Sequence, residues 1–139
     1  MLSQADQETI VSAITKAESL TSGEIRVHID KACPGEPLER AKQVFGELKM
    51  HETALRNGVL IYISFSDKKL AILGDKGIHD AVPSNFWDST RESMIRHFKN
   101  GDFAKGIIAA VKEAGDQLKV YFPVQEGDIN ELSNEITLG

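Results

Sequence analysis

The sequence has little cysteine, no long apolar run and no excess of basic residues. Its single cysteine, Cys33, cannot form a disulfide within the chain, so no oxidising compartment is required. Lys and Arg total 16 against 21 Asp and Glu, giving a net charge of −5. This balance argues against a nucleic-acid partner, because such proteins neutralise phosphates with basic side chains. The longest apolar run, 58–65, is too short to span a membrane.

Several functional signatures are also missing. The N-terminus has no basic region followed by an apolar stretch, so we expect no secretory signal and, with no anchor visible, a cytoplasmic location. There is no nucleotide-binding glycine loop, no nucleophile elbow and no pair of histidines at zinc-binding spacing. Cys33 lies in a proline- and glycine-containing loop, and a thiol with no base nearby in sequence is not a candidate nucleophile.

The patterns that remain are typical of one α/β domain. A chain of 139 residues with 41% hydrophobic residues can bury a core of its own. Helical periodicity predicts helices over 3–20, from Pro37 to before Asn57, over 84–99 and over 102–118, with a short helical stretch before Pro83. Ser3 or Asp6 is expected to cap the first helix, and Ser84 the third long one. We expect the domain to span 1–122 and the acidic segment 123–139 to be a loosely held tail.

Three strands are predicted, over 24–30, 58–65 and 69–73. The first alternates apolar and polar residues, which suggests an edge strand with one wet face and places His28 at the surface. The second is apolar on both faces, as in the middle of a covered sheet. A helix between the first two strands predicts a parallel pair, and the short turn 66–68 predicts an antiparallel hairpin to the third. The sheet is therefore small and mixed.

Polar residues converge at one edge of this predicted sheet. The starts of the first two strands and the end of the third bring together Glu24, Asn57 and Asp75, each beside a glycine. Carboxylate, amide and backbone oxygens suit a hard cation such as Ca²⁺ or Mg²⁺. Glycine, asparagine and aspartate also occur at strand ends for turn reasons alone. The pattern therefore leaves two interpretations open, a cation site and a set of ordinary turns.

Four segments, in order, resemble the TPM-domain family. They are Thr21-Ser22-Gly23-Glu24-Ile25-Arg26-Val27, Arg56-Asn57-Gly58-Val59-Leu60-Ile61, Gly74-Asp75-Lys76-Gly77, and His97-Phe98-Lys99-Asn100-Gly101-Asp102-Phe103 followed by Gly106. The resemblance covers roughly residues 3–121. It implies a three-layer α/β/α sandwich of Rossmann-like appearance.

The resemblance also implies a divalent-cation site, and the family's thylakoid-lumen member is described as an acid phosphatase. By position, the matching ligands are Glu24, Asn57 and Asp75, and Arg56 and Lys76 beside them are candidate anion contacts. Other family members are envelope-anchored proteins or accessory subunits of receptors. The chain has neither a visible signal nor a visible membrane anchor, in contrast to the common family pattern.

These features support one main hypothesis and one alternative. The main hypothesis is a divalent-cation-binding domain with, at most, a weak metal-dependent phosphatase activity. Hydrolysis needs a nucleophile or metal-bound hydroxide together with positive groups for the phosphoryl, and no phosphatase motif is visible. The alternative is a non-catalytic accessory module that binds another protein.

Overall fold

A computed structural model describes residues 2–124 and 134–139 of the chain. The elements, in order, are α1 (Gln4–Glu18), β1 (Glu24–Asp30), α2 (Pro37–Glu47), β2 (Gly58–Ser64), β3 (Lys69–Gly74), α3 (Lys76–Ala81), α4 (Asp88–Lys99), α5 (Phe103–Tyr121) and β4 (Thr137–Leu138). Residues 125–133, within the predicted tail, lie outside the described part. The described residues that follow them include β4.

The strands form one mixed sheet in the order β3-β2-β1-β4. β1 and β2 are parallel, in a register that runs from Glu24 opposite Gly58 to Asp30 opposite Ser64. β2 and β3 form the antiparallel hairpin, and β4 runs parallel to β1. The predicted topology of the first three strands is confirmed, because a helical crossover and a tight turn each allow only one strand direction.

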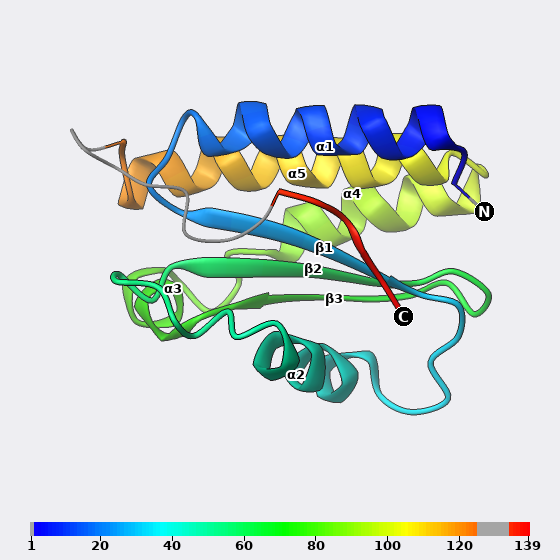
Figure 1. Ribbon diagram of the computed structural model, residues 1–139, viewed down its shortest axis with the longest axis horizontal. Helices are drawn as coiled ribbons and strands as arrows, with labels where there is room; N and C mark the ends of the chain where they lie inside the picture. Colours follow the sequence, from blue (N-terminus) through cyan, green and yellow to red (C-terminus); the bar gives the residue numbers. More distant parts are fainter. Residues whose placement is uncertain (1, 125–133) are drawn as a thin grey trace.

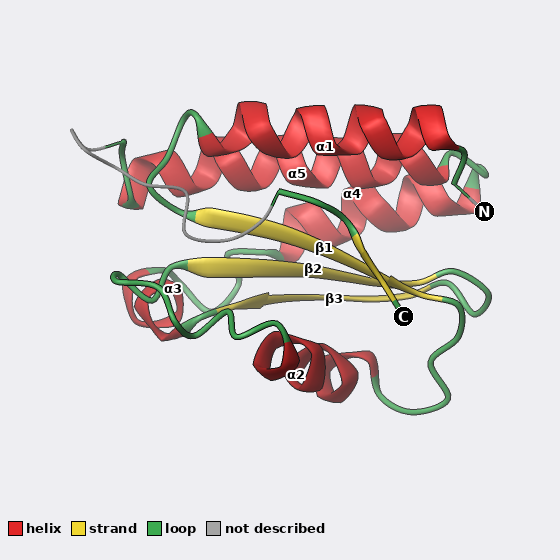
Figure 2. Cartoon of the chain, in the orientation of Figure 1, coloured by secondary structure: helices red, strands yellow, loops and turns green. Residues whose placement is uncertain are grey.

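Helices cover both faces of the sheet, as the predicted three-layer sandwich requires (Figures 1 and 2). α1, α4 and α5 form one layer, and their apolar residues pack with Ile25, Val27, Val59 and Ile61 in the larger core. α2 forms the opposite layer over Leu60 and Tyr62. Alternate side chains of β2 thus pack in two different cores, one on each face of the sheet, which explains why the whole strand is buried.

The prediction that β1 is an edge strand is wrong, because β1 lies between β2 and β4. The polar residues of β1 find partners inside the protein: Asp30 bonds to Arg40 of α2, and His28 lies 2.8 Å from Thr137 of β4. His28 and Asp30 are each 5% exposed. The surface position predicted for His28 is therefore also wrong. Alternation of polar and apolar residues in a strand indicates a solvent-exposed face only where the polar side chains have no hydrogen-bond partners within the protein.

Of the two predicted helix caps, the one on α1 is confirmed and the one on α4 is wrong. Ser3 caps α1 as expected, since its Oγ accepts from Asp6 N–H at 3.0 Å and the Asp6 side chain accepts from Ser3 N–H. α4 begins at Asp88 rather than after Ser84, and its cap residue, Trp87, makes no side-chain capping bond. The Trp87 ring packs against the larger core instead, so burial rather than capping chemistry sets this helix start.

Candidate functional site

The predicted edge of the sheet gathers three separate segments through backbone contacts. Glu24 N–H donates to Asn57 O at 3.2 Å, which joins the starts of β1 and β2. Asp75 N–H donates to Gly58 O at 2.9 Å, which extends the hairpin register by one residue past β3. Glu24, Asn57 and Asp75 are thus neighbours at one end of the sheet.

Two carboxylates lie in one row across this end of the sheet. Glu24 is in register with Gly58, and Gly58 faces Asp75, so all three share the face on which α2 packs. With strands about 4.8 Å apart, the outer two Cα atoms are separated by about 10 Å. Glu24 is 4% exposed and Asp75 6% exposed. Gly58, between the two carboxylates in this row, contributes no side chain of its own.

Asp75 is held by several donors. Its Oδ2 accepts from Arg56 Nε at 2.7 Å, and its Oδ1 accepts from Arg56 Nη2 at 2.9 Å and from Lys76 N–H at 2.7 Å. Burial alone would raise the pKa of Asp75, but these hydrogen bonds and the charges of Arg56 and His51 lower it. An ionised carboxylate offers about four acceptor positions, so one on Oδ2 remains.

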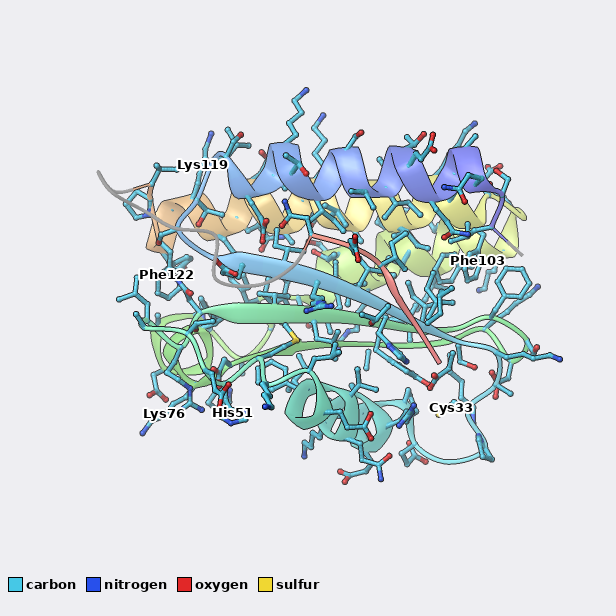
Figure 3. The ribbon with its side chains drawn as sticks, in the orientation of Figure 1. Cys33, His51, Lys76, Phe103, Lys119 and Phe122 are labelled. Carbon is cyan, nitrogen blue, oxygen red and sulfur yellow. The ribbon has the colours of Figure 1, made fainter. Side chains whose placement is uncertain are left out.

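Arg56 is fixed by an unusual backbone conformation. Its φ is +52°, in the left-handed region, and its carbonyl accepts from Gly77 N–H at 2.8 Å. A Cβ at Gly77 would lie 2.3 Å from Leu55 O, so only glycine allows this approach. The turn before β2 is thereby locked to the start of α3. Lys76 reaches Asp75 through its backbone N–H, while its exposed side chain lies at the same end of the molecule as His51 (Figure 3).

Asn57 ties the site to the turn before β1. Its Nδ2 donates to Ser22 O at 3.2 Å, and the side chain is buried. The amide nitrogen is therefore used structurally, and Oδ1 is the atom suited to a ligand. Of the predicted site residues, Glu24, Asn57 and Asp75 come together, and Arg56 contacts only Asp75 among them.

Glu18, at the end of α1, is a residue of this region that sequence reasoning missed. Its Oε2 accepts from Ile25 N–H at 2.8 Å, while Oε1 is buried without a partner among the described residues. Burial raises the pKa of Glu18 to about 8, against the effect of the Ile25 hydrogen bond, and the charge of Glu24 adds to the rise. The sequence signal that could have identified Glu18 is its position at the end of the predicted first helix, one short turn before Glu24.

The ligand chemistry here is that of oxygen atoms. Carboxylate, amide and carbonyl oxygens bind Ca²⁺ and Mg²⁺. Within residues 2–124 and 134–139, no three His, Cys, Asp or Glu side chains are grouped so that they could hold a metal ion. A cation at this end of the sheet would thus rely on Glu24 and Asp75 together with amide, backbone and water oxygens.

A second polar cluster lies farther along β1. Asp30 accepts from Arg40 Nε at 2.8 Å and from Tyr62 Oη at 2.6 Å, and it pairs with His28 Nε2 at 2.8 Å. Burial opposes ionisation, but these three partners hold the pKa of Asp30 well below its usual range. His28 Nδ1 also lies 2.8 Å from Thr137 Oγ1, which links the cluster to β4. Its groups are mutually satisfied, so we assign it a structural role.

Among the described residues, no helix combines the length and apolar character that crossing a bilayer requires.

Comparisons with known proteins agree with this architecture. The family model described as the TPM domain matches residues 1–117. The BA42 protein of the psychrophilic bacterium Bizionia argentinensis, solved by NMR, is 46% identical, with a TM-score of 0.94, over 100% of this chain and 96% of that chain. A search of curated proteins finds no match.

Two more distant structures share the fold. The N-terminal domain of a P. gingivalis protein is 17% identical with a TM-score of 0.70, covering 87% of this chain and 78% of that chain. The N-terminal domain of the Corynebacterium glutamicum cg2496 protein is 15% identical with a TM-score of 0.67, covering 84% and 73% respectively. At this identity the likeness concerns the fold alone. The match to the family model covers most of the sequence, and the chain belongs to the TPM-domain family.

Proposed function

We propose that this TPM domain binds a divalent cation, Ca²⁺ or Mg²⁺, through Glu24, Asn57 and Asp75. The observation that carries the proposal is the row of two buried carboxylates on either side of Gly58. A bound cation would add to the compensation that Arg56 already gives the buried Asp75 carboxylate, and would also lie against the Glu24 carboxyl group. Gly58, which lies between these two residues in the row, contributes no side chain of its own.

Arg56 is the competitor in this site. Its guanidinium donates to both carboxylate oxygens of Asp75, from Nε to Oδ2 and from Nη2 to Oδ1. A cation therefore binds either at the remaining position of Asp75 Oδ2 or after the guanidinium has moved aside. Since the Arg56 side chain is 46% exposed, it can move into solvent, and the cation then replaces it as the partner of the buried Asp75 carboxylate.

Competition by Arg56 gives a directional test. We expect Arg56→Asn to raise the affinity for Ca²⁺ about tenfold, equivalent to about 1.4 kcal/mol, because Asp75 loses a competing positive group. Asparagine is chosen because it tolerates the left-handed backbone at this position. Isothermal titration calorimetry measures the change, and Arg91→Asn on α4 is the control, since Arg91 pairs with the exposed Asp88 instead.

Removing ligand charge should have the opposite effect. We expect Glu24→Gln and Asp75→Asn each to weaken Ca²⁺ binding at least tenfold while leaving the circular dichroism spectrum unchanged. Asparagine at 75 retains an oxygen that can cap α3, which protects the fold. Glu8→Gln on the exposed face of α1 is the matched control. Equal affinity in all three variants would exclude this site.

The choice between the two cations depends on how many ligands the protein supplies. Mg²⁺ keeps several waters in a strict octahedron, whereas Ca²⁺ accepts six to eight oxygens in irregular arrangements. The site offers few side-chain oxygens, so water would complete the coordination shell of either ion. Parallel titrations with Ca²⁺ and Mg²⁺ determine which of the two binds more tightly.

A weak phosphatase activity is the second candidate function, favoured by the position of Arg56 and Lys76 beside Asp75. In this proposal the cation polarises the phosphoryl group, and the two basic residues hold its oxygens. The test is hydrolysis of an aryl phosphate with Ca²⁺ or Mg²⁺ present. Turnover that is lost in Asp75→Asn supports it, whereas turnover that survives both Asp75→Asn and Glu24→Gln assigns the activity to a contaminant or another site.

A further inference from the structure

The far edge of the sheet, at β3, carries unpaired backbone groups. Asp75 N–H points to β2, so by alternation the N–H and C=O groups of Leu70, Ile72 and Gly74 point away from it. β3 is the last strand of the sheet on this side. Within the described part of the chain, no residue bonds to these outward groups. Such an edge is a template for another extended chain.

A cavity of about 320 Å³ lies along this same edge. Ile72 and Gly74 of β3 form one wall. Ile78 of α3, Val82 and Trp87 form the facing wall, and Ser84 contributes an exposed hydroxyl at the rim. The edge is thus one wall of a groove between β3 and the segment that joins α3 to α4.

We propose that this groove binds an extended peptide segment of another protein, which adds to β3 as an antiparallel strand and places an apolar side chain against Trp87. Extended polypeptide presents N–H and C=O groups every second residue, about 6.8 Å apart, which matches the outward groups of β3. Cross-strand neighbours point to the same face of a sheet, so the peptide residue opposite Ile72 directs its side chain into the cavity.

A positive charge at one end of the groove specifies the peptide further. Lys68 is exposed just before β3, whereas Lys69 Nζ is already bound to Cys33 O and Gly35 O. A strand antiparallel to β3 has its C-terminal end beside Lys68. The matching peptide is therefore apolar at its centre and acidic at its C-terminal end.

A second copy of this chain fits the groove less well. Its own β3 would carry with it the segment between α3 and α4, which bounds the groove on every copy. Pairing two copies through β3 would have to accommodate both of these segments at the interface. A peptide without flanking structure meets no such obstacle.

The probe is a seven-residue peptide with blocked ends that alternates threonine and valine and finishes in two aspartates. Trp87 is the only tryptophan in the chain, so its fluorescence reports binding at the groove wall directly. Hydrogen exchange of the Leu70, Ile72 and Gly74 amides reports strand addition. We expect saturable fluorescence change together with at least tenfold slower exchange of these three amides.

Three controls separate the possible occupants. A peptide methylated at the backbone nitrogens that face β3 keeps its side chains but should bind at least tenfold more weakly. Ser84→Phe, which fills the groove, should weaken binding tenfold, whereas Asn85→Phe, exposed but not lining it, should not. Lys68→Glu should weaken binding about threefold at low salt, and Lys49→Glu, whose backbone is also left-handed, should have no effect.

Several results would overturn the proposal. One is the absence of binding at millimolar peptide, and another is binding that is insensitive to backbone methylation, which indicates a simple apolar cavity. Protection of the three amides that depends on protein concentration without peptide would identify a second copy as the occupant. Because the probe is metal-free and the groove excludes Glu24 and Asn57, none of these outcomes bears on the cation site.

Discussion

Glu18 shows how one buried carboxyl group couples stability to pH. Its pKa is raised to about 8, so the folded protein binds this proton more tightly than the unfolded chain does. The stabilisation from the bound proton is complete below about pH 4.5 and is lost as the pH rises towards 8. Glutamine at this position would stay neutral at every pH and still accept from Ile25 N–H.

We therefore expect Glu18→Gln to stabilise the protein relative to wild type above pH 7. The gain should be on the order of 1–2 kcal/mol, reduced from the full value because Glu18 is only partly buried as a residue. It should shrink to nothing near pH 4.5. Urea denaturation from pH 5 to 9 measures it, with the exposed Glu8→Gln as control. A pH-independent difference would contradict the assignment.

Asp30 behaves in the opposite way. Its pKa lies well below its usual range because Arg40, Tyr62 and His28 bind the ionised form more strongly than burial opposes it. This stabilisation is present above about pH 4 and is lost as the pH falls through the lower pKa of the folded protein.

Replacing Asp30 by asparagine should cost at least about 2 kcal/mol at pH 7. Breaking a fully buried ion pair costs about 3–5 kcal/mol. Because the Arg40 side chain is 30% exposed, we expect the smaller cost of about 2 kcal/mol. The deficit should narrow as the pH falls from 5 to 2. Denaturant melts at each pH check both the size and the direction of the effect. A deficit that widens on acidification would mean that another group is responsible.

At the scale of elements, the contact between the β2 entrance and α3 is the most constrained. Gly77 N–H meets Arg56 O, and a Cβ at Gly77 would collide with two backbone carbonyl oxygens, which cannot turn aside. This contact positions Arg56 beside Asp75. The packing of α3 against the turn before β2 and the geometry of the candidate site therefore both depend on Gly77.

Gly77→Ala should therefore destabilise the protein by about 1–3 kcal/mol, as overpacking against backbone does. Gly46→Ala in α2 is the matched control, because a Cβ there meets nothing within 4 Å. It should stabilise the protein by about 0.5–1 kcal/mol, since alanine suits a helix better than glycine. Thermal unfolding distinguishes the two signs. Equal effects at both positions would refute the close approach.

The elements also show where sequence reasoning succeeds. Loop lengths determine the directions of β1, β2 and β3, because a crossover helix and a short turn leave no alternative. β4 gave no signal, since two residues carry no periodicity and pair with a strand more than a hundred positions earlier. Because the sequence does not reveal β4, it wrongly predicts β1 at the edge of the sheet.

At the scale of the whole molecule, the sequence predicts which residues of the candidate site come together. It predicts their interactions only in part. Topology alone brings Glu24, Asn57 and Asp75 to one sheet end. The engagement of Asp75 by Arg56 depends on a left-handed backbone at Arg56, which sequence does not reveal for a non-glycine residue. Glu18 depends on how α1 ends against β1, which is a matter of tertiary packing.

The most direct test of the cation site is an NMR titration of the isotopically labelled protein with CaCl₂. We expect saturable amide shifts concentrated at 23–25, 57–59 and 75–77, the three segments that meet at this end of the sheet, and we expect Glu24→Gln to abolish them. Shifts confined to other segments, or shifts that persist unchanged in Glu24→Gln, would contradict a cation site formed by Glu24, Asn57 and Asp75.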